Sequence, residues 1–163
     1  MLKRLALSIL LLAGIALGTG VGIYFCAGQK SRSRDEPLRV EARGVGRQWH
    51  FSYAGADGIL GSGDDPVTTD ELRLPEHAKV VIQLRSKDFI YVFSCPDLNL
   101  KEIAVPDLEF SIAFRTAGAA RYVLAMDPMC GFPAAPGETM GNLQVVSESD
   151  FQSWLGSCFH RSP

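Results

Sequence analysis

From Val40 onward, short stretches of alternating hydrophobic and polar residues follow one another, separated by glycine and proline. The stretch 48–53 places Trp49, Phe51 and Tyr53 on one face, as one side of a half-buried strand requires. Further strands are predicted at 71–74, 79–85, 88–94, 110–115, 122–126 and 142–146. Many short strands at regular spacing predict an all-β sandwich or barrel.

Two other segments complete the predicted domain. Residues 54–70 are rich in glycine and aspartate and are predicted to form a loop. After the last strand, Ser147 is predicted to cap a short helix through Leu155, because acidic side chains follow it at the positive end of the helix dipole. The domain is therefore predicted to cover residues 40–155, with residues 156–163 as a tail.

The first part of the chain has a different character. Residues 5–25 carry no charge, and as a helix they would span about 31 Å, roughly one hydrocarbon core. We predict that residues 1–28 form one transmembrane anchor; the alternative is a cleaved signal peptide, but the apolar run exceeds the usual length of about 7–15 residues. Residues 29–39 are predicted to be a linker. Because large domains cross a membrane largely regardless of flanking charge, we expect the C-terminal domain on the outer side.

Composition excludes several classes of function. The net charge is −2 and the Lys and Arg residues are scattered, so nucleic-acid binding is not expected. The chain has three histidines, too few and too poorly placed for a catalytic triad, and it has neither a P-loop nor a GxGxxG motif. No catalytic residue is therefore assigned. The cysteines form no CxxC pair and no zinc spacing; they are Cys26, Cys95, Cys130 and Cys158.

A series of short motifs runs along the predicted domain. In order they are Gln48-Trp49, Phe51-x-Tyr53-x-Gly55-x-Asp57-Gly58, Glu71-Leu-x-Leu-Pro75, Leu84-x-Ser86-x-Asp88-x-Ile90, Phe93, Pro96, Leu100-Lys101, Ala104-Val-Pro106, Cys130-Gly131, Met140 and Val145-Val-Ser-x-x-x-Phe151-x-x-Trp154-Leu. This order and spacing resemble cytochrome c oxidase subunit II over about Arg43 to Leu155. The resemblance implies a cupredoxin-like Greek-key β-sandwich on a membrane anchor. One anchor instead of the family's commoner pair is a departure.

In that family a binuclear copper centre is held by two bridging Cys, two His, one Met and one Glu carbonyl. Carried over from the resemblance, these positions fall on Tyr91, Met126, Pro128, Cys130, Ala134 and Met140. Only Cys130 and Met140 keep the family's side chain, and Pro128 still offers a carbonyl. One thiolate and two thioethers without a histidine suit neither a binuclear nor a blue-copper site. The resemblance therefore implies a degenerate site, and copper binding is not expected.

Three interpretations of single residues stay open at this point. The sulfurs of Met126, Met129, Met140 and Cys130 could hold one Cu(I), or these side chains could simply pack the cavity. Trp49 resembles the family's electron-entry aromatic, and the alternative is a packed core aromatic. Cys95 and Cys130 could form a disulfide in an oxidising compartment, and the alternative is two buried free thiols.

The resemblance implies a subunit II-like component of a haem–copper terminal oxidase that has lost the binuclear copper site and acts structurally or in docking. Its implied location is a bacterial-type inner membrane, with the domain on the periplasmic side. Its implied partners are the membrane, subunit I, other oxidase subunits and a cytochrome c. Binuclear copper is the family's cofactor, and none is expected here. The alternative is a stand-alone, membrane-anchored cupredoxin-like binding module without redox activity.

Overall fold

The computed structural model describes residues 36–55, 57–127 and 137–159. All of them fall in one compact unit of the chain, Arg34–Pro163. No helix within these ranges is long and apolar enough to cross a membrane. The predicted anchor at residues 1–28 lies outside the described residues, so it stays a prediction.

The larger of the two main sheets has five strands in the order β3-β2-β1-β5-β8. The strands are β1 (Leu38–Val45), β2 (Gln48–Tyr53), β3 (Val67–Thr69), β5 (Lys79–Ser86) and β8 (Phe110–Arg115). Strands β1 and β5 run parallel, and the other neighbours are antiparallel. The hairpin of β1 and β2 is closed by a tight turn at residues 46–47.

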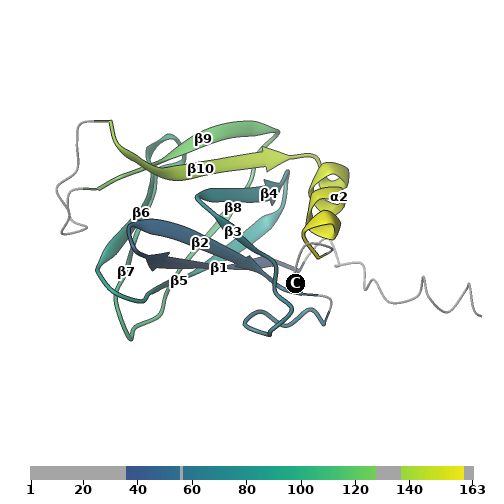
Figure 1. Cartoon of the computed structure of the whole chain (residues 1–163). Helices are drawn as coiled ribbons and strands as arrows, with labels where there is room; N and C mark the ends of the chain where they lie inside the picture. Colours follow the sequence, from purple (N-terminus) through teal and green to yellow (C-terminus); the bar gives the residue numbers. More distant parts are fainter. Residues whose placement is uncertain (1–35, 56, 128–136, 160–163) are drawn as a thin grey trace, which may run out of the picture. The chain divides into compact units, whose positions relative to one another are not determined.

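The second sheet has the order β4-β10-β9 and lies over the first (Figure 1). Its strands are β4 (Glu71–Pro75), β9 (Ala120–Ala125) and β10 (Thr139–Val146). A separate ribbon of β6 (Tyr91–Cys95) and β7 (Leu100–Ala104), joined by the short 3-10 helix η1 (Pro96–Leu98), lies at one end. The all-β sandwich predicted from the sequence is confirmed.

The core forms where the inward faces of the strands meet. In β2 the residues alternate between buried and partly exposed, so Trp49, Phe51 and Tyr53 all point inward as predicted. Strand β5 alternates in the same way and buries Val80, Ile82 and Leu84. In contrast, all five residues of β6 are buried, because this strand is covered on both faces.

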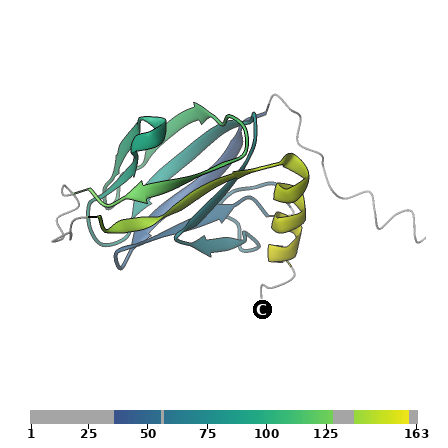
Figure 2. The same ribbon diagram turned by 90° about the horizontal axis from the view of Figure 1, so that it is seen from above.

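The C-terminal helix α2 (Glu148–Phe159) covers the other end of the sandwich (Figure 2). As predicted, Ser147 caps it: the Asp150 N–H donates to the Ser147 hydroxyl at 3.1 Å. The helix buries Phe151, and Trp154 packs edge-on against Tyr53 with ring centroids 5.1 Å apart. This packing holds α2 onto the sandwich.

Several elements differ from the sequence-based prediction. Strand β7 was not predicted, and β9 and β10 begin at Ala120 and Thr139, earlier than predicted. Four further differences have a local cause. Strand β1 begins at Leu38, inside the predicted linker, because it pairs with β5 from its first residue. Strand β3 lies inside the predicted loop, where three residues pair with β2. Strand β6 begins at Tyr91 and not at Asp88, because the Asp88 carboxylate binds backbone N–H groups of a turn. Helix α2 continues past Leu155 into the predicted tail.

Candidate functional site

Three of the positions that the resemblance assigns to the family's copper ligands are described, and they lie toward the end of the sandwich formed by β6 and β7. Tyr91 opens β6, Met126 follows β9, and Met140 lies near the start of β10. Three more of these positions lie outside the described residues: Pro128, Cys130 and Ala134. Their predicted roles therefore stay predictions.

Tyr91 is a fully buried core residue. Its ring packs against Trp49 with centroids 5.5 Å apart and planes tilted by 54°. Its hydroxyl accepts a hydrogen bond from the Arg47 N–H at 3.0 Å and donates to the Asp88 carboxylate at 2.8 Å. The phenol therefore serves an internal hydrogen-bond network and a buried aromatic contact together.

Gly44 in β1 makes room for this ring. A Cβ atom at position 44 would lie 2.3–2.6 Å from three ring atoms of Tyr91. Contacts below 3.0 Å cannot be kept, so a side chain at position 44 and the ring at position 91 exclude each other. Tyr91, which the resemblance assigns to the position of the family's histidine, is therefore matched by a glycine in β1 of the five-stranded sheet.

The turn at residues 46–47 is clasped by the same network. Both residues have positive φ, 58° for Gly46 and 73° for Arg47, which is typical of a two-residue hairpin turn. The Gly46 N–H donates to the Asp88 carboxylate at 2.7 Å, beside the bond from Arg47 to Tyr91. Asp88 and Tyr91 together accept both N–H groups of the turn. We call this arrangement the turn clasp.

Asp88→Asn is expected to weaken the turn clasp in a pH-dependent way. Slight burial opposes ionisation of Asp88, but hydrogen bonds from Gly46, Tyr91 and Phe89 outweigh it and hold the carboxyl pKa below its ordinary value of 3.8. A lowered folded-state pKa stabilises the fold above the ordinary pKa, and this stabilisation is lost as the pH falls through the folded-state pKa. At neutral pH the free energy of unfolding of the variant should be lower by about 1 kcal/mol at most. The loss is small because the carboxylate is exposed and water screens its interactions.

The measurement is urea unfolding of both proteins between pH 7 and pH 3. The difference between wild type and variant should be complete at neutral pH and should shrink below the ordinary aspartate pKa. A difference that is constant with pH would contradict the assignment of Asp88 as the ionised acceptor.

Trp49 lies in the interior with no exposed surface. Its ring contacts Tyr91, Phe93 at 5.9 Å and Phe51 at 6.4 Å, and its backbone N–H donates to the Asp70 carboxylate at 3.1 Å. The structure therefore places this residue at the centre of an aromatic cluster. Trp49 itself therefore presents no aromatic surface that a redox partner could contact.

The two described thioethers pack against the same core. Met140 is buried and lies at an irregularity of the pairing between β10 and β9, where the register shifts between Thr139 and Gly141. Met126 is half-buried, packs against the core, and its N–H donates to the Glu138 carbonyl at 3.2 Å. Both contacts are those of core-filling methionines.

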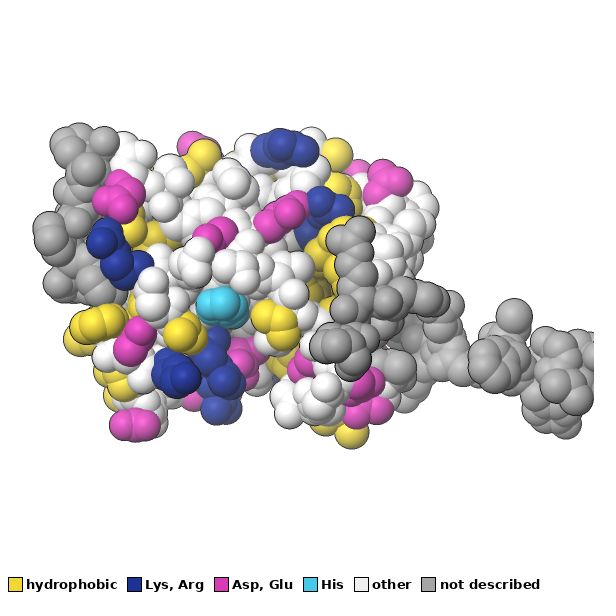
Figure 3. Space-filling model, in the orientation of Figure 1, with side chains coloured by type: hydrophobic (Ala, Val, Ile, Leu, Met, Phe, Trp, Pro, Cys, Tyr) yellow, Lys and Arg dark blue, Asp and Glu magenta, His cyan; other side chains and the backbone are white. Residues whose placement is uncertain are grey.

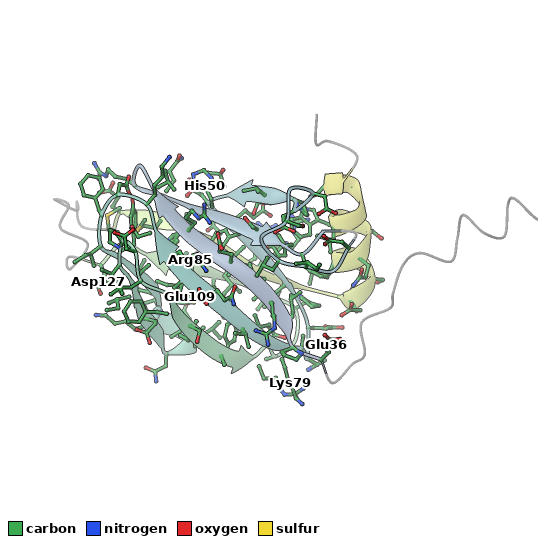
Figure 4. All side chains as sticks on the ribbon, turned by 90° about the horizontal axis from the view of Figure 1, so that it is seen from below. Glu36, His50, Lys79, Arg85, Glu109 and Asp127 are labelled. Carbon is green, nitrogen blue, oxygen red and sulfur yellow. The ribbon has the colours of Figure 1, made fainter. Side chains whose placement is uncertain are left out.

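Two ion pairs at this end have no signal in the sequence. Lys101 Nζ lies 2.7 Å from the Asp127 carboxylate, whose side chain is only 12% exposed. Arg47 reaches Glu138 at 3.1 Å and so connects the β1–β2 turn to the residue before β10. Figure 4 shows Asp127 at this end of the domain. Spacing along the chain could not reveal these pairs, because each joins residues from different strands or turns.

The described donors do not fit a copper centre. Among the described residues there is no group of three or more His, Cys, Asp or Glu side chains that could hold a metal ion. His50 lies on the outward side of β2 beside Thr69, and His77 lies in the turn before β5. At the described positions of the predicted ligand set, the donors are a phenol that is engaged in the turn clasp and two packed thioethers, whereas copper centres rely on thiolate and imidazole.

Cys95 is the last residue of β6 and is buried. Burial raises the pKa of its thiol, which disfavours the reactive thiolate form. It is a free thiol with respect to the described cysteines. The proposed partner Cys130 lies outside the described residues, so the disulfide stays a prediction.

Comparison with known proteins agrees with the fold and with the sequence resemblance. The chain is 26% identical over 170 residues to the alternative cytochrome c oxidase subunit 2 of Bradyrhizobium diazoefficiens, covering 86% of this chain and 61% of the relative. It is 26% identical over 121 residues to cytochrome c oxidase subunit 2 of Synechocystis, covering 74% of this chain and 33% of the relative. No family model matches the chain.

The periplasmic domain of subunit II (CoxB) of Bradyrhizobium japonicum superposes with a TM-score of 0.63 at 16% identity, covering 80% of this chain and 97% of that one. The predicted resemblance is thus confirmed, and the described domain is a subunit II-like cupredoxin domain. The chain spans between about a third and three fifths of the length of these two curated relatives.

Proposed function

We propose that this chain is a subunit II-like component of a haem–copper terminal oxidase whose cupredoxin domain acts structurally and in docking, without a binuclear copper centre. The similarity to subunit II proteins supports the oxidase assignment. The observation that supports a structural role without a copper centre is the environment of Tyr91. Its ring is buried against Trp49 and its hydroxyl is engaged with Arg47 and Asp88.

The chemistry of this position favours a structural role. A histidine at a copper site presents an imidazole nitrogen that is free to bind the metal. The Tyr91 hydroxyl instead donates its proton to Asp88 and accepts from the Arg47 N–H. To bind a metal, the phenol would have to break both bonds inside a close-packed core. These bonds tie the turn at residues 46–47 to the start of β6, which is a structural role.

The proposal places the chain at a membrane. Residues 1–28 would anchor it, residues 29–39 would form the linker, and the domain would lie on the periplasmic side of a bacterial-type inner membrane. Its partners would be subunit I and other oxidase subunits, and electrons would reach the haems by a route that bypasses this domain.

The first test is copper binding by the purified full-length chain, incubated with excess Cu(II) under mild reduction. We expect less than one copper ion per chain and no absorption or EPR signal of a mixed-valence pair. Cys130→Ser, which removes the single family thiolate, should leave the copper content unchanged. Two copper ions per chain, lost on Cys130→Ser, would show that the ligand set is functional and would overturn the structural role.

The second test is purification of the full-length chain from its native membranes, followed by haem analysis. Co-purification with a haem-containing integral membrane subunit is the expected result. A chain that purifies alone, folded and free of haem, would instead favour the stand-alone binding module.

A further inference from the structure

Strand β8 ends the five-stranded sheet, and its outer edge pairs with no described strand. The neighbouring ribbon contributes no ladder to this edge, because β7 pairs with β6. A free edge presents unpaired backbone N–H and C=O groups, and natural sheets usually blunt it with a proline, a bulge or an inward-pointing charge. Strand β8 has none of these: its sequence is FSIAFR, and its register with β5 is regular.

One hydrogen bond shows which backbone groups of β8 point to the free edge. The Thr116 N–H donates to the Ala78 carbonyl at 3.0 Å, which continues the antiparallel register of β8 with β5. Successive N–H groups of a strand alternate in direction, so the even-numbered residues of β8 bond to β5 and the odd-numbered ones point outward. The outward groups include those of Ser111 and Ala113, and both residues are exposed.

The sequence around β8 is self-complementary about Ile112. From Glu109 to Arg115 the residues are acidic, aromatic, small, isoleucine, small, aromatic and basic. Two antiparallel copies centred on Ile112 would place Glu109 of each opposite Arg115 of the other. They would also place Phe110 opposite Phe114, and both of these rings are half-buried on the inward face. Opposite charges and aromatic pairs in such positions stabilise antiparallel strands, so the edge fits a second copy of itself.

The same register satisfies the backbone. It places Ser111 opposite Ala113 of the second copy, and both have their N–H and C=O groups on the free edge. Residues opposite each other in this way exchange two hydrogen bonds, with Cα atoms about 5.5 Å apart. A shift by two residues would leave Glu109 opposite Ala113 or Ala117, which are uncharged. A shift by one residue would place inward-facing side chains opposite outward-facing ones.

The charges at both ends of β8 are accessible. Glu109 forms an ion pair with Arg85, and the Arg115 guanidinium donates to the His77 carbonyl at 2.9 Å. Both Glu109 and Arg115 are exposed, and a carboxylate has a second oxygen and a guanidinium further N–H groups for another partner. Figure 4 labels Glu109, which precedes β8, and Lys79, which pairs with Arg115, so the two labels mark the ends of the strand.

The overall charge of the chain does not oppose the meeting of two copies. The net charge is −2, which is small for a chain of this length. Figure 3 shows Lys and Arg side chains interspersed with Asp and Glu side chains on the visible face. Two copies therefore repel each other only weakly at a distance.

We propose that two copies of this chain form a homodimer by pairing their β8 strands antiparallel about Ile112, which joins two five-stranded sheets into one. The contact is isologous, so the same residues serve both copies. Pairing of two copies is independent of whether the chain belongs to an oxidase.

The register is tested by disulfide crosslinking of the full-length chain in its native membranes. Ser111→Cys and Ala113→Cys are introduced into two differently tagged copies. The expected Cα separation of about 5.5 Å lies within the range of disulfides, about 4.4–6.8 Å. We expect a disulfide between position 111 of one copy and position 113 of the other, identified by mass spectrometry.

Each variant expressed alone is the matched control for the crosslink. In a dimer of one variant the two new thiols lie on diagonal neighbours about 7–8 Å apart, which is too far for a disulfide. The unaltered chain gives the background from the native cysteines.

The dimer itself is measured by sedimentation of the full-length chain in detergent. Ala113→Pro removes an N–H that points to the free edge and leaves the bonds to β5 intact, so the dimer should be lost while circular dichroism shows an unchanged fold. Arg115→Glu should weaken dimerisation about tenfold, because like charges then meet at both ends of the interface. Adding Glu109→Arg to Arg115→Glu restores opposite charges and should recover the dimer.

Three results would overturn the homodimer. They are a monomer at every concentration, a dimer that survives Ala113→Pro, and a mixed-copy disulfide no stronger than that of the single variants. Capture of a different protein in place of the second copy would overturn it as well. Recovery of the dimer by the charge exchange does not depend on how well the proline variant folds.

Discussion

Gly44→Ala is expected to lower the free energy of unfolding by about 3 kcal/mol, the upper end of the range for overpacked cores. The added methyl group would lie 2.3 Å from the nearest ring atom of Tyr91. The ring cannot move aside, because it is fully buried, packs on Trp49 and is tied at its hydroxyl to Arg47 and Asp88. Either the hydrogen bonds of the turn clasp break or β1 moves away from Tyr91, and both changes lower the stability of the fold.

The measurement is urea unfolding followed by circular dichroism on residues 34–163, which form their own compact unit. Gly118→Ala is the matched control, because a Cβ atom at position 118 meets nothing within 4 Å and the glycine does not need positive φ. The double variant Gly44→Ala/Tyr91→Ala should lose much less unfolding free energy than the sum of the losses of the two single variants. If Gly44→Ala unfolds at the same urea concentration as Gly118→Ala, the close packing of position 44 against the Tyr91 ring does not limit the size of the side chain there.

Trp49→Ala is expected to have the largest effect of any single change considered, about 3–5 kcal/mol. The indole has no exposed surface and is the shared member of contacts with Tyr91, Phe93 and Phe51. Its removal leaves a cavity beside residues of β2 and β6, and the contacts of the indole with three aromatic rings are lost as well. At the typical stability of small domains, such a loss can unfold the protein.

Trp154→Ala is the comparison for this prediction. Trp154 is also an aromatic residue in a cluster, but it is half-buried on α2 under the Arg73 guanidinium, 4.9 Å from its ring. Its removal should cost clearly less than that of Trp49, and the helix should be affected more than the sheets. Equal losses for the two variants would contradict the central position of Trp49. Thermal unfolding by circular dichroism gives both values.

Local pattern was enough to predict much of the fold. Alternation in 48–53 and 79–85 identified two strands and the residues that they bury, because a strand with one buried face imposes a period of two. Ser147 was identified as a cap from its own side chain and the acidic residues after it. Strand β3 was missed because its three residues have no period of their own and pair only through contact with β2.

The site was predictable to a lesser extent, and for a physical reason. Aligning motifs predicted that Tyr91 occupies a ligand position, but the sequence did not show what its hydroxyl does. The role of the hydroxyl depends on Arg47 and Asp88, which are distant in the sequence and are brought together by the pairing of β1 with β5. The matching glycine at position 44 is likewise meaningful only once the ring is placed against it. Such pairs are properties of the folded chain.

The parallel pairing of β4 with β10 has a consequence for the order in which the domain can fold. Leu72 in β4 pairs with Leu143 in β10, so the partner of this strand is synthesised only after all of β5 to β9. Until then the buried face of β4, with Leu72 and Leu74, is exposed to water or to a chaperone. Folds dominated by such distant pairings form in about milliseconds to seconds. A nascent chain that stalls before residue 139 therefore carries an unpaired hydrophobic strand, and aggregation competes with folding until β10 emerges.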